Sequence, residues 1–136
     1  MTVTVKVAQQ LLAQEGMAGL IAGFLKYLKA GKEGAPSYFG RDVAYHKPRA
    51  AVLSDLHHLH LKPTAAEEAL EAPYRPWDDR AAQYYRTSNK FMVYTRGEQD
   101  CDCYVVLAIV FPRAHELAED GNHMAGLIAM AESAKK

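Results

Sequence analysis

The stretch CYVVLAIVF, residues 103–111, decides the fold of this chain. A continuous apolar run of this length is typical of a central β-strand that is covered on both faces. Just upstream, KFMVYTRG at 90–97 has the pattern of a second strand, and GEQD at 97–100 is a turn between the two. Residues 90–111 therefore predict two consecutive strands joined by a turn.

Two more strands and an N-terminal helical region complete the first half of the pattern. LSDLHHLHLK at 53–62 reads as a strand, and VTVKV at 3–7 as a short first strand. Residues 7–16 predict a short helix closed by Gly16, and apolar residues from 17 to 28 recur at helical spacing before Gly31 and Gly34. Residues 34–50 hold two glycines and two prolines and are expected to be irregular.

Two C-terminal helices follow the strands. Pro112 can begin a helix that Gly121 ends, and Asn122 can cap the last helix. The segment 63–80 is proline-rich and acidic, with a turn of helix at 64–71. This order predicts one α+β domain over residues 1–136, with N-terminal and C-terminal helices packed on one face of a mostly antiparallel sheet.

Composition narrows the class of protein without deciding its function. The chain has 136 residues, 16 basic and 16 acidic, so net charge does not indicate a nucleic-acid partner. The segment 86–96 nevertheless carries three basic residues and no acidic one. No apolar run reaches the roughly 18 residues of a membrane span, and a cytoplasmic protein with reduced Cys101 and Cys103 is expected.

Alternation along the strands predicts where chemistry could lie. His58, His60 and Lys62 share one face of their strand, and Lys90, Tyr94 and Arg96 share one face of the next. If the apolar faces of the sheet pack on the helices, these six side chains gather on the open face, with Arg86 at its edge. Imidazoles near neutral pH and a guanidinium suit metal-independent RNA cleavage, which needs a base, an acid and a phosphate-binding cation.

Each of these residues also has an ordinary interpretation. Two same-face histidines are typical of a solvated strand, and a His-x-His pair can hold a metal, although alternation puts the nearest third ligand, Asp55, on the opposite face. Tyr94 can be half-buried, and Arg86 and Arg96 can form surface salt bridges with the acidic loop. His115 and His123 are equally typical of surface or capping positions.

Several motifs occur together in the order of a known family. These are YFGRD at 38–42 with Tyr45, HLHL at 58–61, RT at 86–87, VY at 93–94, and LAIVFPRAHELAEDGNHMAGLIAMAE at 107–132. The chain resembles the YafO toxins of type II toxin–antitoxin systems from about Tyr38 to Glu132. The resemblance implies a RelE-like fold, ribosome-dependent mRNA cleavage without metal or cofactor, and three partners: an antitoxin, the ribosome and mRNA.

The same resemblance suggests roles for matching residues. His60 would transfer the proton, with His58 as the alternative; Arg86 would bind the scissile phosphate, and Tyr94 would orient or stack a base. Lys62, Lys90, Arg96 and Arg41 would bind the RNA backbone, and His115 and Asn122 could join the site. Two other functions stay open at this point: a non-catalytic RelE/ParE-like binding module, and a metal-dependent hydrolase that uses the His-x-His pair.

Overall fold

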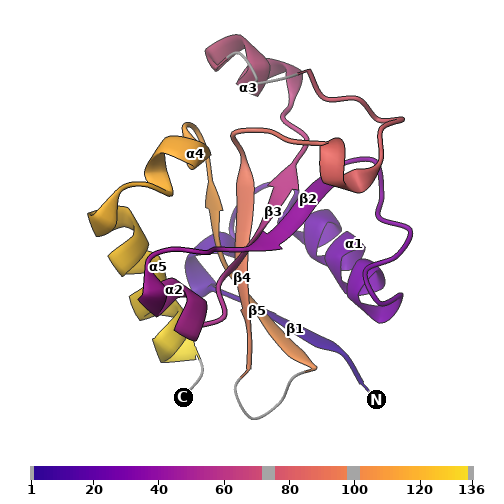
Figure 1. Cartoon of the computed structure of the whole chain (residues 1–136). Helices are drawn as coiled ribbons and strands as arrows, with labels where there is room; N and C mark the ends of the chain where they lie inside the picture. Colours follow the sequence, from indigo (N-terminus) through magenta and orange to yellow (C-terminus); the bar gives the residue numbers. More distant parts are fainter. Residues whose placement is uncertain (1, 72–75, 98–101, 135–136) are drawn as a thin grey trace.

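The computed structural model describes residues 2–71, 76–97 and 102–134 and contains one five-stranded sheet (Figure 1). The strands are β1 (Thr4–Val7), β2 (Phe39–Ala44), β3 (His57–Leu61), β4 (Phe91–Arg96) and β5 (Cys103–Val110), in the spatial order β1-β5-β4-β3-β2. Strand β1 pairs parallel to β5, and all other pairs are antiparallel. The predicted mostly antiparallel sheet is therefore confirmed.

Helices cover both faces of this sheet, so the prediction of a single helical layer is wrong. Helix α1 (Met17–Lys29) lies on one side, and α5 (Gly121–Ala134) lies on the other with α2 (Arg49–Leu53) (Figure 1). Alternate residues of β5 enter different cores, with Val106 in the α1 core and Val105 and Leu107 in the α5 core. The apolar run at 103–111 was thus the correct signal, because only a strand covered twice needs apolar side chains on both faces.

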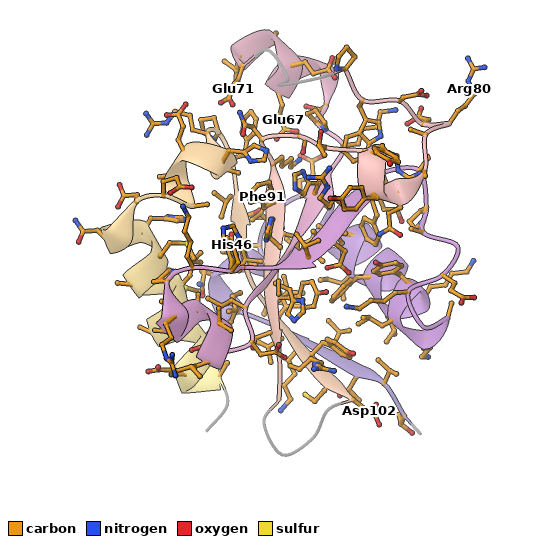
Figure 2. All side chains as sticks on the ribbon, in the orientation of Figure 1. His46, Glu67, Glu71, Arg80, Phe91 and Asp102 are labelled. Atoms are coloured by element: carbon orange, nitrogen blue, oxygen red, sulfur yellow. The ribbon has the colours of Figure 1, made fainter. Side chains whose placement is uncertain are left out.

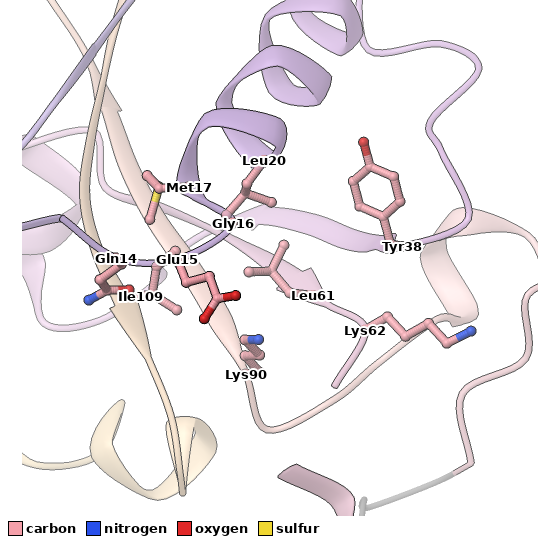
Figure 3. Close-up of a pocket in the computed structure, with 10 residues that line it drawn as sticks. All are labelled: Gln14, Glu15, Gly16, Met17, Leu20, Tyr38, Leu61, Lys62, Lys90 and Ile109. Atoms are coloured by element: carbon pink, nitrogen blue, oxygen red, sulfur yellow. The ribbon is translucent and has the colours of Figure 1, made fainter. Parts of the chain in front are cut away.

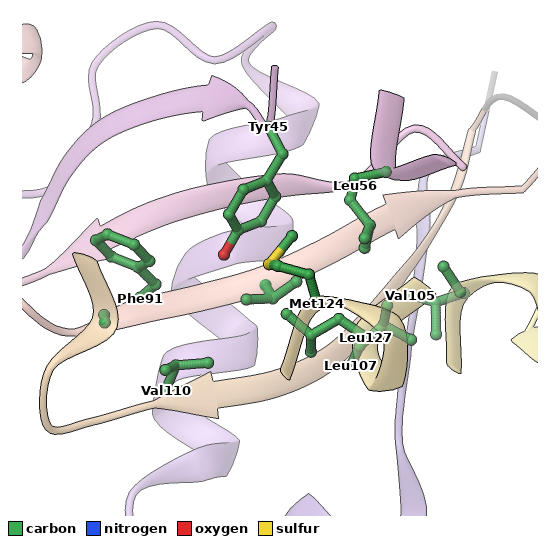
Figure 4. Close-up of a cluster of buried hydrophobic side chains, with 12 residues drawn as sticks. Tyr45, Leu56, Phe91, Val105, Leu107, Val110, Met124 and Leu127 are labelled. Carbon is green, nitrogen blue, oxygen red and sulfur yellow. The ribbon is translucent and has the colours of Figure 1, made fainter. Parts of the chain in front are cut away.

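Each face has a separate apolar core. Under α5, Met124 and Leu127 pack on Phe91 and Leu107, as Figure 4 shows. Under α1, Phe24 is fully buried against Tyr94 and Phe39. The two cores hold the sheet from both sides, which makes the side chains of its inner strands inaccessible except near the strand ends.

Two helix ends differ in detail from the sequence prediction. Asp120, rather than Asn122, caps α5, because its carboxylate accepts the backbone N–H groups of Asn122 and His123. The short helix predicted at 7–16 is only a 3-10 turn, η1 (Gln9–Leu11). The turn of helix at 64–71 is confirmed as α3 (Ala65–Leu70), and a reciprocal capping box between Thr64 and Glu67 begins it.

The region 34–50, predicted to be irregular, contains the edge strand β2. Its pairing with β3 shifts register between Phe39 and Asp42, so a bulge lies at Gly40 and Arg41. A second 3-10 turn, η2 (Gln83–Tyr85), packs against this strand, and the short helix α4 (Ala114–Leu117) precedes α5. The bulge and the glycine hide the period-2 pattern that identifies a strand.

The fold class predicted from the sequence is confirmed: the domain is α+β and consistent with a small RelE-like domain. The turn at GEQD and the state of Cys101 lie outside the described residues. Cys103, which is described, is a free thiol. Among the described helices, none is long and apolar enough to cross a membrane.

Gly40 provides a test of how tightly β2 is packed. A methyl group on its Cα would overlap the backbone carbonyl oxygen of Arg86 and the Trp77 ring. We expect Gly40→Ala to lower the free energy of unfolding by about 1–3 kcal/mol in urea denaturation, because the backbone must shift to relieve the overlap. Gly126→Ala, in open space on α5, is the control and is expected to stabilise by about 0.5–1 kcal/mol. Equal stability of the two variants would contradict this packing.

Candidate active site

Three histidines gather around one aromatic ring on the α5 face of the sheet. The centroid of the Phe91 ring is 4.7 Å from that of His58, 4.6 Å from His60 and 5.0 Å from His115. His58 and His60 come from β3, and His115 comes from α4, so the cluster joins residues more than fifty positions apart. Figure 2 labels Phe91, which belongs to β4 in the middle of the sheet.

His60 is the most strongly fixed of the three. It is 1% exposed, and its Nδ1 accepts the backbone N–H of Ser88 at 3.0 Å. Ser88 is itself held, since its hydroxyl donates to the carbonyl oxygen of Leu61. Because Nδ1 is used as an acceptor, the neutral imidazole carries its proton on Nε2. His60 is therefore oriented to donate a hydrogen bond rather than to accept a proton.

Burial keeps the cluster uncharged at neutral pH. Burial lowers the pKa of His58 to about 4 and that of His60 to about 2, and the neighbouring imidazoles act in the same direction. Partial desolvation also lowers the pKa of His115, as does the positive charge of Arg41. His115 is the exposed member of the three, so it is the one that a substrate could reach directly.

Arg41 lies on the same face as the histidines. It is part of the bulge in β2, and the adjacent Asp42 points to the opposite face. Its guanidinium donates from Nε to the carbonyl oxygen of Tyr84 at 2.9 Å, and its positive charge lowers the pKa of both His60 and His115. A fixed cation beside three neutral imidazoles is suited to binding an anion.

Tyr94 lies on the other face, so the prediction that it shares a surface with His58 and His60 is wrong. In the β3–β4 register His57 faces Tyr94, whereas His58 faces Val93. The Tyr94 hydroxyl donates to Asp42 at 2.6 Å and accepts from Lys32 at 2.9 Å, and its ring is fully buried against Phe24. Burial and the Asp42 carboxylate raise the pKa of Tyr94 well above its ordinary value.

Asp42 is the centre of this second polar cluster. Its side chain is only 5% exposed and also accepts the Tyr27 hydroxyl at 2.8 Å, while Lys32 lies 3.4 Å away. Gln83 donates in turn to the Tyr27 hydroxyl. A buried carboxylate with this many donors ties β2, α1 and β4 together.

The Arg86 side chain is also engaged in hydrogen bonds within the fold. It is 7% exposed, and its guanidinium donates to the backbone carbonyl oxygens of Phe39, Ala81 and Pro36. These bonds fix the chain before β2 to the segment before β4. All three nitrogens of the guanidinium are engaged with backbone carbonyl oxygens, so the geometry gives Arg86 a structural position, and Arg41 is the cation that lies near His60 and His115.

The three other predicted RNA-binding residues are paired with acidic side chains. Lys62 contacts both carboxylate oxygens of Asp79 at 3.0 Å, and Lys90 contacts Glu67 at 2.8 Å. Both lysines line a pocket of about 230 Å³ on the α1 face, shown in Figure 3. Arg96 binds Asp55 at the opposite end of β4.

Three acidic side chains from the described parts of the segment 63–80, those of Glu67, Glu71 and Asp79, therefore bind groups near the ends of β3 and β4. Besides Glu67 and Asp79, Glu71 accepts from the Asn89 side chain and from the backbone N–H of Arg113. Asn89 in turn accepts the backbone N–H of His115. The acidic segment thus holds α4, and with it His115, in place.

The His-x-His pair does not form a metal site within the part of the chain that the structure describes. No group of three or more His, Cys, Asp or Glu side chains is arranged there to hold a metal ion. Asp55, the nearest candidate, binds His57 at 2.9 Å and Arg96 instead. Nδ1 of His58 is buried without a hydrogen-bond partner.

Sequence reasoning missed Ser88, Tyr84 and the buried network of Asp42. Ser88 has no motif around it, and only the fold brings its N–H to His60. Tyr84 and Tyr85 are adjacent aromatic residues in a polar segment, a composition that could have suggested an exposed binding surface. Asn122, His123 and Asp120 lie at the start of α5 in an ordinary helix-capping arrangement.

Comparison with known proteins is consistent with the motifs. The model of a family described as "Toxin YafO, type II toxin-antitoxin system" matches residues 25–136. The mRNA interferase toxin YafO of Escherichia coli (strain K12) is 32% identical over 128 residues, which cover 91% of this chain and 88% of that protein. No solved structure matches the chain significantly.

The position of Tyr94 predicts a structural effect of its hydroxyl. We expect Tyr94→Phe to lower the free energy of unfolding by about 1–3 kcal/mol in urea, because the buried Asp42 carboxylate loses a donor. The exposed Tyr84→Phe serves as the control and is expected to change stability by less than about 0.5 kcal/mol. A Tyr94→Phe protein of unchanged stability that had lost RNA cleavage would instead give this hydroxyl a chemical role.

The buried histidines predict a dependence of stability on pH. The folded-state pKa of His58 lies below its ordinary value of 6.5, so the unfolded chain binds more protons, and stability falls as pH drops from about 6.5 toward 4. We expect His58→Phe to flatten this dependence by up to about 1.4 kcal/mol per pH unit, measured by urea denaturation at several pH values. His123→Phe is the control, and an identical pH slope in His58→Phe and the wild-type protein would show that His58 is not buried neutral.

Proposed function

The chain belongs to the YafO family of toxins from type II toxin–antitoxin systems, and from this membership we propose that it is an mRNA interferase. In this proposal the protein cuts messenger RNA during translation, in the cytoplasm, and a cognate antitoxin neutralises it. The relative from Escherichia coli has the name of an mRNA interferase toxin. The observation that carries the proposal for this chain is the cluster of His58, His60 and His115 beside Arg41.

The proposed reaction is a transesterification within the RNA, for which side chains of this protein would supply proton transfer and a positive charge. A base removes the proton of the 2′-OH, the 2′ oxygen forms a bond to phosphorus, and the bond from phosphorus to the 5′ oxygen breaks. The leaving 5′ oxygen takes a proton, and the products are a 2′,3′-cyclic phosphate and a 5′-hydroxyl. The charge that develops on the phosphate must be balanced by fixed donors.

The geometry favours a division of these roles among the cluster. His115 is exposed and neutral at pH 7, so it can accept the 2′-OH proton and later return it to the 5′ oxygen. His60 is 1% exposed and its Nδ1 accepts from Ser88, so it would act from behind His115 as a positioning residue that fixes the segment before β4. Arg41 would balance the negative charge, and His58 would pack behind His60.

The residues on the other face would act through the fold. Tyr94 and Arg86 hold β2, β3 and the segment before β4 in register, so their substitution would reduce the amount of folded protein. Lys62 and Lys90 would bind an RNA backbone only after it displaces Asp79 and Glu67. Such an exchange would make the contribution of these lysines strongly dependent on salt concentration.

The proposal is tested by cleavage of a defined message with and without ribosomes, read by primer extension. Wild-type protein is expected to cut only in the presence of translating ribosomes. We expect His115→Gln to cut about 10²–10⁴-fold more slowly, because it removes the group that transfers the proton, while its stability stays near that of the wild type.

His123→Gln, another histidine near the start of a helix but outside the cluster, is the matched control. Its cleavage rate is expected to equal that of the wild type. Growth arrest by wild-type protein without cleavage of translated messages would favour a non-catalytic binding module. Full activity of His115→Gln would remove this residue from the reaction.

A further inference from the structure

Two adjacent tyrosines stand exposed beside the histidine cluster. Tyr84 and Tyr85 are 57% and 59% exposed, and their ring centroids lie 5.4 Å apart with the rings nearly perpendicular. Two large aromatic rings in water lack the favourable free energy that burial in a core or an interface would give them. The pair therefore forms an apolar, π-rich surface in an otherwise polar segment.

The backbone under these rings is held on both sides. On one side, Gln83 donates to the Tyr27 hydroxyl and to the carbonyl oxygen of Gly40. On the other side, the buried guanidinium of Arg86 donates to three backbone carbonyl oxygens. The flanking side chains thus point inward and are fixed, which leaves the two rings between them pointing outward from a rigid support.

Arg41 connects these rings to the histidines. Its guanidinium lies 4.0 Å from the centroid of the Tyr84 ring and donates to the Tyr84 carbonyl oxygen, while its backbone N–H donates to the carbonyl oxygen of Arg86. Only two residues separate Tyr85 from Ser88, whose N–H binds His60. Arg41 therefore lies between the Tyr84 ring and the histidine cluster, since its charge also acts on His60 and on the exposed His115.

We propose that Tyr84 and Tyr85 form a stacking platform for a nucleobase of single-stranded RNA, with Arg41 binding the phosphate next to that base. This inference rests on the proposed function, because the base that it binds belongs to the RNA that the protein is proposed to cut. Stacking on an exposed tyrosine accepts every base, with modest preferences that follow stacking strength, and the Arg41 guanidinium adds a charge contact to the phosphate. The platform would thus fix where the message is cut.

The test compares variants in the ribosome assay with primer extension. Tyr84→Ala and Tyr85→Ala are expected to cut about 5- to 100-fold more slowly and to lose the preference among cut sites. Tyr84→Phe, which keeps the ring, is expected to recover most of the rate and the preference. Leu12→Ala removes an apolar side chain of similar exposure far along the sequence and serves as the control. Alanine variants with wild-type rates and cut sites would overturn the platform while leaving the proposed function intact.

A binding measurement tests the stacking platform separately if the wild-type protein shows no cleavage. If wild-type protein cuts no message, the proposed function fails, and fluorescence anisotropy with labelled, 2′-O-methylated RNA tetranucleotides then decides the platform by itself. The platform predicts weaker binding when one nucleotide is made abasic, and a Tyr84→Ala protein that no longer distinguishes abasic from intact RNA. Absent binding, or equal loss of affinity for both RNAs, would overturn it.

Discussion

The register between β3 and β4 is the constraint on which the rest of the structure depends. Directly paired residues of neighbouring strands point to the same face of a sheet. A shift of one residue in the pairing would therefore exchange the faces. Here His57 is paired with Tyr94 and His58 with Val93. This pairing sends His58 and His60 toward α5 and Tyr94 toward α1, so the sheet separates side chains that alternation along the two strands predicted to share one face.

The cluster around Asp42 and the cluster of histidines have different physical characters and are joined through β2. Asp42 enters the α1 face, where tyrosine hydroxyls and Lys32 surround its charge, and the next residue back, Arg41, enters the face of the histidines. The first cluster is closed, with its donors and acceptors paired to one another, as suits a structural junction. The second combines neutral imidazoles with a cation and an exposed edge, an arrangement that leaves capacity for an anion. Neutral net charge is compatible with this second cluster, because only the facing surface acts within a Debye length of about 8 Å.

Glu67, Glu71 and Asp79, from the described parts of the acidic segment, add further contacts near the ends of β3 and β4. Their carboxylates neutralise Lys62 and Lys90 and steady α4 through Asn89, so the strand-end cations contribute less to the field of the free protein than their number suggests. The cation beside the histidines is then Arg41, a residue in an edge strand that its own bulge makes hard to recognise. The chemistry of the site thus depends on contacts between segments far apart in the chain.

Much of the fold could be read from the sequence, since three consecutive strands, the long first helix and the last helix follow from apolar periodicity. Alternation within β3 was also correct, because a strand fixes the faces of its own residues. The register between β3 and β4 could not be predicted from the sequence, because it is set by the pairing with neighbouring strands and by the apolar cores on both faces of the sheet. For the same reason the sequence could not show that the Arg86 guanidinium donates to three backbone carbonyl oxygens, or that the Ser88 N–H donates to His60. Alternation identified His58 and His60, and the resemblance to a family added Arg41 and His115, while geometry decided which other residues lie beside them.

The most direct test is to determine which face of the sheet contacts RNA. Side-chain NMR spectra of isotope-labelled protein, recorded while a non-cleavable single-stranded RNA is added, report on imidazole, guanidinium and tyrosine groups separately. The account predicts shifts in the His60, His115 and Arg41 signals with the Tyr94 and Lys32 signals unchanged, and a His60 ring whose proton stays on Nε2. Shifts confined to Tyr94, Lys32 and His57 would place the RNA on the α1 face and contradict it.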